Sequence, residues 1–372
     1  MDKRLYSLDL LRGLDMFLLA VIGPLVQGAD RVWHLPKAVM AQFRHPWGGF
    51  TLWDIIMPLF IFMCGAAIPF ALTRRMDAEG RPTAAFWRHI LWRVAMLWVL
   101  GLCVQGQLLS FDLLKISPYC NTLQTIAAGY LIAALVLTVP SACVRLVLPI
   151  VFLAVYGLLV HFGGDYTREG NFTWLVEKKI LACLLPAESI RLTVKGCGGY
   201  TWFLPTLVFG AMTLAGCQAT TVLRSARSEK AKALILLAAG LVCLAVGWAL
   251  VPMGVPMIKQ FFTVSFTLQA IGWCVLALDV LYVLTDILRL RRGLGIFILF
   301  GQCALTAYLL HTLFAPATKA LATVFVQGCP QIFGSDAQPF ILAVAEGVVI
   351  VALLYLRQSL RAAKACKSEA AR

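Results

Sequence analysis

A histidine, a tryptophan and a carboxylate stand close together in residues 43–54, just before a long apolar stretch that begins at Ile55. His45 and Asp54 are separated by a turn that contains Pro and Gly. An imidazole changes its charge near neutral pH, and it is the usual proton acceptor in catalysis. A nearby carboxylate would fix its tautomer and stabilise the imidazolium formed during proton transfer. We therefore predict a catalytic pair. The alternative is an N-cap aspartate and an interfacial histidine among the tryptophans of a membrane belt.

The composition places this pair in a membrane protein. The 372 residues are 60% hydrophobic and 13% charged, whereas soluble proteins have about 45–50% apolar and about 25% charged residues. The net charge of +14 does not indicate nucleic-acid binding, because Lys and Arg are retained in cytoplasmic loops to fix the orientation of membrane proteins. We therefore predict an integral membrane protein with no nucleic-acid partner.

Apolar stretches near 20 residues, the length that crosses about 30 Å of hydrocarbon, occur about ten times in the chain. We predict an all-α bundle that forms a single transmembrane domain over residues 1–372. The expected spans are Leu10–Val26, Leu52–Leu72, Ile90–Leu109, Leu123–Val139, Val144–His161, Trp202–Cys217, Ala233–Val251, Phe261–Leu284, Leu294–Phe314 and Phe340–Tyr355.

The basic residues predict the orientation of these spans. With a cytoplasmic N-terminus, 21 of the 32 Lys and Arg residues fall on the cytoplasmic side. The positive-inside rule therefore predicts that both termini are cytoplasmic. The loop from Gln27 to Gly49, which contains His45, then lies on the outer face.

Polar residues near the outer ends of other spans are expected to line a pocket at the level of His45. They are Asn121, Gln124, Lys259 and His311, and with Trp47 we predict them to bind the substrate. Polar groups in hydrocarbon need such a cavity or mutual hydrogen bonds.

Near the inner end of the first span, Arg12 is spaced i,i+3 from both Asp9 and Asp15. Arg12 either helps to bind an anionic group that comes from the cytosol, or it belongs to a helix start whose charges neutralise one another.

The cysteine pattern indicates neither a metal site nor a redox motif. None of the twelve cysteines forms Cys-x-x-Cys, and we predict no bound metal. Cys183 and Cys197 fall in one predicted outer loop, where they could pair or remain free thiols. The chain also lacks the P-loop, Rossmann, His-Glu-x-x-His and Gly-x-Ser-x-Gly motifs.

Several motifs resemble the heparan-α-glucosaminide N-acetyltransferase family, the transmembrane acetyltransferases of lysosomes and their bacterial relatives. The resemblance runs along most of the chain. The motifs that carry it are Arg4-x-x-Ser7-x-Asp9-x-x-Arg12-Gly13, His45-x-Trp47-x-Gly49-x-Thr51-x-x-Asp54-x-x-x-Pro58-x-Phe60-x-Phe62-x-x-Gly65, Leu123-Gln124, Lys259-x-x-x-Thr263-x-Ser265-Phe266, and Gly301-x-x-Ala304-Leu305-x-x-Tyr308-x-x-His311.

This resemblance implies an enzyme of the bacterial inner membrane that transfers the acetyl group of cytosolic acetyl-CoA to a terminal amino sugar outside, such as a glycosaminoglycan fragment. The family's active-site histidine maps onto His45 and its nearby acid onto Asp54. Arg12, Thr51 and Ser265 are the expected contacts to the acetyl-CoA donor. The chain departs from the family at Thr125 and Cys303, which replace an arginine and an asparagine. The segment from the histidine to the threonine is one residue shorter, and Ile22-Gly23-Pro24 offers no counterpart of an asparagine in the first span. These departures concern the acceptor more than the reaction class.

The sequence is also compatible with two other functions. One is O-acylation of a cell-envelope polysaccharide, in which the same histidine acts on a hydroxyl group. The other is a sugar transporter without chemistry, although the chain shows no internal repeat of the kind that marks many transporters. Direct transfer and an acetyl-histidine intermediate are both compatible with the sequence, as are a monomer and a homodimer in the membrane.

Overall fold

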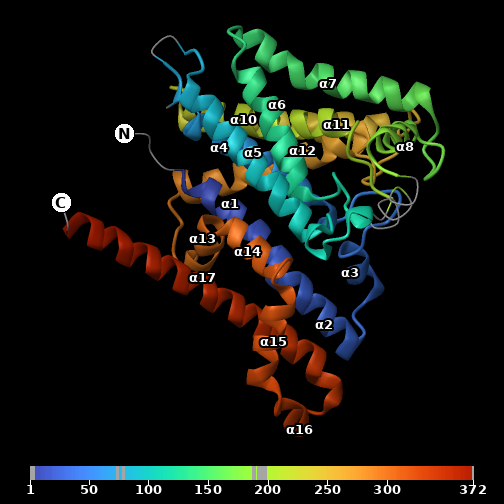
Figure 1. The fold of residues 1–372 in the computed structure, drawn as a ribbon. Helices are drawn as coiled ribbons and strands as arrows, with labels where there is room; N and C mark the ends of the chain where they lie inside the picture. The colour runs from blue at the N-terminus through green and yellow to red at the C-terminus, as the bar shows by residue number, and fades with distance from the viewer. Residues whose placement is uncertain (1–4, 73–74, 78–79, 187–189, 191–198, 371–372) are drawn as a thin grey trace. The chain divides into compact units, whose positions relative to one another are not determined.

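The computed structural model describes residues 5–72, 75–77, 80–186, 190 and 199–370. Within these ranges every regular element is a helix (Figure 1), which confirms the all-α prediction. Seven of the described helices are long and apolar enough to cross a membrane, or eight if a bent pair is counted as one span. The prediction of ten spans with cytoplasmic termini remains a prediction.

The seven helical segments overlap seven of the predicted spans, and their ends differ from the predicted ends by up to nine residues. They are Leu52–Ala71, Ala84–Val104, Ala142–Gly163, Thr206–Arg224, Glu229–Leu250, Val264–Ile287 and Ser335–Lys364. The predicted span Leu123–Val139 corresponds to a shorter apolar helix, Thr122–Leu137. The predicted span Leu294–Phe314 is interrupted at Cys303, and the chain bends by 77° between Ala304–His311 and Ala315–Val326.

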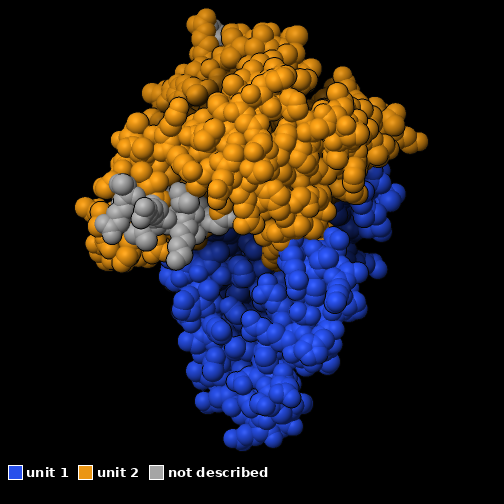
Figure 2. All heavy atoms as spheres, turned by 90° about the vertical axis from the view of Figure 1, so that its right-hand side faces the viewer, with its two compact units in different colours: residues 1–44, 280–372 blue, residues 45–279 orange. Residues whose placement is uncertain are grey.

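The chain divides into two compact units, coloured separately in Figure 2. Unit 1 contains residues 1–44 and 280–372, and unit 2 contains residues 45–279. The boundary falls directly before His45. The helices of unit 2 are α4 (Ile56–Ala71), α5 (Ala84–Val104), α6 (Thr122–Leu137), α7 (Ala142–Gly163), α8 (Phe172–Leu184), α10 (Thr206–Arg224), α11 (Glu229–Leu250) and α12 (Val264–Tyr282), whose last turn crosses into unit 1.

Two glycines let α4 and α10 pack at the centre of unit 2. A Cβ atom on Gly65 of α4 would lie 1.8 Å from the carbonyl oxygen of Thr213 on α10. A Cβ on Gly216 of α10 would lie 2.0 Å from the carbonyl oxygen of Phe62 on α4. Small residues at such positions allow the backbones of membrane helices to meet closely. Because the Asp54 turn leads directly into α4, this contact fixes the helix that carries the predicted acid.

We expect Gly65→Ala to destabilise the protein by about 1–3 kcal/mol or more, because a backbone atom cannot move aside as a side chain can. Thermal unfolding in detergent would measure the loss. Gly295→Ala is the matched control, since Gly295 lies in a helix with nothing within 4 Å of its ideal Cβ. Equal melting temperatures for the two variants would contradict the close approach of α4 and α10.

Unit 1 is built from α1 (Tyr6–Phe17), which continues through a π-helical turn at Leu18–Ile22 into α2 (Gly23–Trp33), and from the C-terminal helices. The predicted Leu10–Val26 span lies inside this continuous helix. The remaining helices are α3 (Lys37–Gln42), α13 (Gly295–Gln302), α14 (Ala304–His311), α15 (Ala315–Val326), α16 (Cys329–Phe333) and α17 (Gln338–Ala370).

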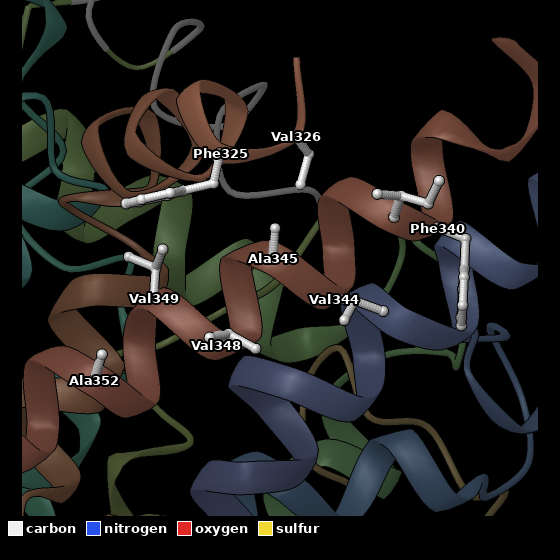
Figure 3. A pocket seen from close by; sticks show the side chains of 9 residues that line it. Phe325, Val326, Phe340, Val344, Ala345, Val348, Val349 and Ala352 are labelled. Carbon is white, nitrogen blue, oxygen red and sulfur yellow. The ribbon is translucent and has the colours of Figure 1, made fainter. Parts of the chain in front are cut away.

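A cavity of about 450 Å³ lies between α15 and α17, and Figure 3 shows the side chains that line it. Its lining is apolar throughout, from Phe325 on α15 to Ala352 on α17. It offers no titratable group, so it lacks the means for acid–base chemistry.

Candidate active site

A capping box positions the predicted acid. Thr51 precedes a 3₁₀ turn, Leu52–Ile55, that leads into α4. The backbone N–H and the hydroxyl of Thr51 both donate to Asp54 Oδ2, at 3.0 and 2.9 Å. The backbone N–H of Asp54 in turn donates to the Thr51 side chain, which completes a reciprocal capping box at the helix start. It holds one carboxylate oxygen of Asp54 and leaves the other, Oδ1, for partners from elsewhere in unit 2.

Asp54 Oδ1 joins His45 and Lys259 in a three-residue cluster. His45 Nδ1 lies 2.6 Å from Asp54 Oδ1. Lys259 Nζ lies 3.2 Å from the same oxygen and 3.1 Å from His45 Nδ1. Since a carboxylate oxygen only accepts hydrogen bonds, we assign the Nδ1 proton to the shorter contact, the one with Asp54. In this tautomer Nδ1 cannot accept from Lys259, whose ammonium then pairs with Asp54. The neutral ring then carries its lone pair on Nε2.

Burial separates the roles of the three side chains. Asp54 and Lys259 are 1% and 6% exposed, whereas His45 is 37% exposed. A buried carboxylate and a buried ammonium that pair at 3.2 Å compensate each other's loss of hydration. The imidazole above them is accessible to a substrate, so the cluster has the geometry of a general base supported by a buried ion pair.

Lys259 is held by a loop that connects α11 to α12. Ser265 Oγ donates to the carbonyl of Pro256 at 2.9 Å, and Thr263 Oγ1 donates to the same carbonyl at 2.8 Å. The loop also contains Phe262 in the left-handed region, with φ 51°, which is costly for a bulky residue. These hydrogen bonds close the loop and fix the backbone beside Lys259. The role of Ser265 in donor binding stays a prediction, as does that of Thr51.

Burial lowers the pKa of Lys259 to about 8, although the Asp54 carboxylate opposes this shift. The unfolded chain would keep this proton up to pH ~10.5. Between about pH 8 and 10.5 the unfolded state therefore binds more protons at Lys259, and this contribution makes stability rise with pH. At pH 7 Lys259 carries its charge, so the ion pair with Asp54 is intact.

Three further segments of unit 2 meet the Lys259 loop. Gly49 N donates to the carbonyl of Met257 at 2.9 Å, and Thr201 N donates to the carbonyl of Gln260 at 3.1 Å. The Trp47 ring lies 6.0 Å from that of Phe261, and the Arg168 guanidinium stands 5.0 Å over Trp47. The His45 segment, residues 199–203 and the Arg168 loop thus converge around the Lys259 loop.

A second buried carboxyl, Glu177 on α8, is bonded to residues 199–203. Its Oε2 accepts from the backbone N–H groups of Trp202 and Phe203, at 3.1 and 3.0 Å. Burial raises the pKa of Glu177 to about 7, and these two N–H groups oppose the shift. Tyr200, stacked on Trp202 with ring centroids 5.7 Å apart, has a pKa raised by burial and by the charge of Asp54.

We expect Glu177 to make unit 2 more stable at acidic pH. Because its folded pKa of about 7 exceeds its usual value near 4.5, its contribution is complete below about pH 4.5 and is lost as pH rises through about 7. The full difference is about 3 kcal/mol. Glu177→Gln keeps an oxygen for both N–H groups, so the variant should match the wild type at pH 5 and melt at a higher temperature at pH 8. A difference that does not change with pH would contradict the assignment.

The two predicted polar residues at the start of α6 take part in local hydrogen bonds. Asn121 caps the helix by accepting from Leu123 N at 2.7 Å. Gln124, which is fully buried, accepts from Cys120 N and donates to the carbonyl of Pro118, both at 2.9 Å. Both polar ends of Gln124 are therefore engaged with the loop before α6. Their roles in substrate binding stay predictions.

The predicted residues Arg12 and His311 belong to unit 1. Arg12 pairs with Asp9 at 3.8 Å, as its i,i+3 spacing predicts. The expected pair with Asp15 is not formed: Asp15 is 1% exposed, and neither carboxylate oxygen has a hydrogen-bond partner within the described part of the chain. His311 is the last residue of α14, at the 77° bend that leads to α15.

No sequence pattern marks Glu177, Tyr200 or Trp202 as residues near the site. The region 163–199 was expected to be a loop, but it contains α8, whose start is capped by Asn171 Oδ1 accepting from Trp174 N at 2.8 Å. That Asn, followed by an apolar segment, is the one signal that predicts this helix. Cys183 is exposed, and its predicted partner Cys197 lies outside the described residues.

The described residues contain no group of three or more His, Cys, Asp or Glu side chains that could hold a metal ion. No model of a known protein family matches the chain, and a search of curated proteins finds no match. The geometry of the His45 cluster and the sequence motifs are therefore the features that bear on function.

Proposed function

We propose that this chain is a transmembrane acetyltransferase that transfers the acetyl group of acetyl-CoA to the amine of a glucosamine-type sugar, with His45 as the general base. The observation that carries the proposal is the half-exposed imidazole whose Nδ1 lies 2.6 Å from the buried Asp54. That contact presents a basic Nε2 to a substrate and stabilises the charge that the ring gains.

The reaction balances with these groups alone. The sugar amine, in its neutral form, attacks the thioester carbonyl and forms a C–N bond. Nε2 of His45 takes one N–H proton, and the tetrahedral centre then collapses with cleavage of the C–S bond. The protonated His45 returns its proton to the departing CoA thiolate. The products are an N-acetylated sugar and CoA thiol, and the enzyme is unchanged.

The buried ion pair supports the transfer step. Asp54 holds the imidazole in one tautomer and faces the positive charge that develops on it. Thr51 fixes Asp54 Oδ2, so Oδ1 stays directed to Nδ1. Lys259 keeps Asp54 ionised through their 3.2 Å contact, and we propose it as a positioning residue in addition to its predicted place in the substrate pocket.

Residues near His45 offer surfaces for a sugar. Aromatic side chains stack on apolar faces while their polar edges remain available for hydrogen bonds. Trp47 lies two residues from the base. The charge of Asp54 acts on Tyr200, which stacks on the buried Trp202. The sugar amine is the acceptor, and Arg12 is the proposed contact for an anionic part of the donor. The site is proposed to open on the periplasmic side of a bacterial inner membrane.

Radiolabelled acetyl-CoA supplied to the purified protein in proteoliposomes tests the proposal. Glucosamine and N-acetylglucosamine are the paired acceptors, since they differ only at the amine. We expect label to appear in a sugar amide with glucosamine and no product with N-acetylglucosamine. A hydroxyl ester formed with both sugars would identify an O-acyltransferase. Uptake of unmodified sugar without label transfer would identify a transporter.

A further inference from the structure

A cavity of unit 2 lies at the other end of α4 from Asp54. It measures about 640 Å³ and is bounded by Pro69 near the end of α4, by the first turns of α7 and by the last turns of α10. Pro69 is fifteen residues after Asp54, which corresponds to about 22 Å along a helix. This cavity is therefore separate from the His45 cluster.

Arginines stand at the rim of this cavity, and its wall is mostly apolar. Arg145, Arg224 and Arg227 line it together with side chains such as Leu146, Leu214 and Val222. Arg224 is fixed by a hydrogen bond to the carbonyl of Pro69 and stands 5.0 Å over the Phe70 ring. Three arginines thus line a cavity whose other lining residues are mostly apolar.

Two of these arginines have no acidic partner within the part of the chain that the structure describes. No carboxylate lies within ion-pair distance of Arg145 or Arg227 among those residues. Arg145 lies in the first turn of α7, where the helix dipole adds positive potential. The nearby Asp77 accepts from the backbone N–H of Arg81. Arg145 and Arg227 therefore carry positive charge that no carboxylate of the described residues pairs.

The wall gives no support for a nucleotide. The donors of the polar side chains Gln218 and Thr221 are already used: Gln218 Nε2 donates to the carbonyl of Arg145 at 3.1 Å, and Thr221 Oγ1 donates to that of Cys217 at 2.8 Å. A ribose and a base need several such partners. A phosphate with an apolar tail needs only the arginines and the apolar wall.

The level at which the cavity lies in the membrane also favours a lipid. It lies where α10 ends, at Arg224, and where α7 begins, at Ala142. Both helices are long and apolar enough to cross a membrane, so their ends lie at the level of lipid headgroups. Basic pockets between such helix ends bind anionic headgroups.

We propose that this cavity binds an anionic phospholipid, with the phosphate held by Arg145 and Arg227 and an acyl chain along Leu146, Leu214 and Val222. The phosphate forms charge-assisted hydrogen bonds with the guanidinium groups. The acyl chain excludes water from the apolar wall. The proposal is independent of the acetyltransferase function, because it uses none of the residues of the His45 cluster.

Native mass spectrometry of the delipidated full-length chain, titrated with phosphatidylglycerol or phosphatidylcholine, tests this site. We expect the double variant Arg145→Gln/Arg227→Gln to bind phosphatidylglycerol at least about tenfold more weakly than the wild type. The control Arg357→Gln/Arg361→Gln loses the same charge from α17 and should bind like the wild type. Phosphatidylcholine is zwitterionic, with no net headgroup charge, so it should bind weakly to the wild type and to every variant.

Leu146→Trp keeps all arginines, and its larger side chain fills part of the cavity where the acyl chain would lie. It should therefore also weaken phosphatidylglycerol binding. This second variant tests the site even if the double arginine variant fails to fold. Undiminished phosphatidylglycerol binding in either folded variant would overturn the proposal. Displacement of the bound lipid by micromolar CoA would also overturn it, because the cavity would then be a nucleotide site.

Discussion

We expect His45→Ala to reduce acetyl transfer by at least about 10²–10⁴-fold, because a positioned general base contributes a factor of this size. The loss should fall on kcat more than on KM, since proton transfer occurs in the transition state. The measurement is the initial rate of label transfer from acetyl-CoA to glucosamine. Added imidazole should restore part of the rate in the variant, because the removed ring leaves an opening beside Asp54.

The matched control for this experiment is His89→Ala. His89 lies on α5, and no hydrogen bond or ion pair of the described residues joins it to the His45 cluster. It should retain the wild-type rate. A folded His45→Ala protein with wild-type turnover would rule out His45 as the base, whichever acceptor is used.

The long apolar helices of this protein could be predicted from the sequence, because each depends on a local apolar pattern. A helix such as α7 reads as a continuous apolar run, and its capping residue Ser141 stands directly before it. The break after His311 has one local signal, a proline in the first turn of α15, but the sequence is apolar on both sides and does not predict the 77° bend. Bends of this kind are set by packing between helices, which a one-dimensional pattern does not contain.

The candidate site shows the same division between local and long-range information. Asp54 and His45 are nine positions apart, so their pairing follows from one turn and the Thr51 capping box. Lys259 is 214 positions from His45. The sequence predicts only that Lys259 lies at the same depth in the membrane as His45. Its contact with Asp54 depends on how the loop before α12 folds. Glu177 was not predicted at all, because an acid in an expected outer loop normally faces water.

The largest expected effect on stability comes from the Asp54–Lys259 pair. Asp54→Asn leaves the 6% exposed ammonium of Lys259 without its counter-charge. Removing one partner of a buried pair typically costs about 3–5 kcal/mol. The same variant should reduce acetyl transfer strongly, since the imidazole loses the carboxylate that fixes its tautomer. Unfolding in detergent and initial rates at pH 7 measure the two losses separately.

Lys259→Met should cost less stability, because Asp54 keeps its hydrogen bonds to Thr51 and His45. The double variant Asp54→Asn/Lys259→Met removes both charges, so it should be more stable than Asp54→Asn alone. Coupling energies between contacting residues are usually about 0.5–3 kcal/mol. Additive losses in this cycle would mean that the two side chains do not interact in the folded protein.

The pH dependence of Asp54→Asn gives an independent test of the same pair. Burial already lowers the pKa of Lys259 to about 8 with Asp54 present, and removal of the carboxylate lowers it further. The unfolded chain then binds more protons than the folded chain from below pH 8 up to about pH 10.5. The stability lost at pH 7 should therefore be partly regained at pH 9. A deficit that stays constant between these pH values would show that the buried charge of Lys259 is not its cause, and Asp54 would then act on His45 alone.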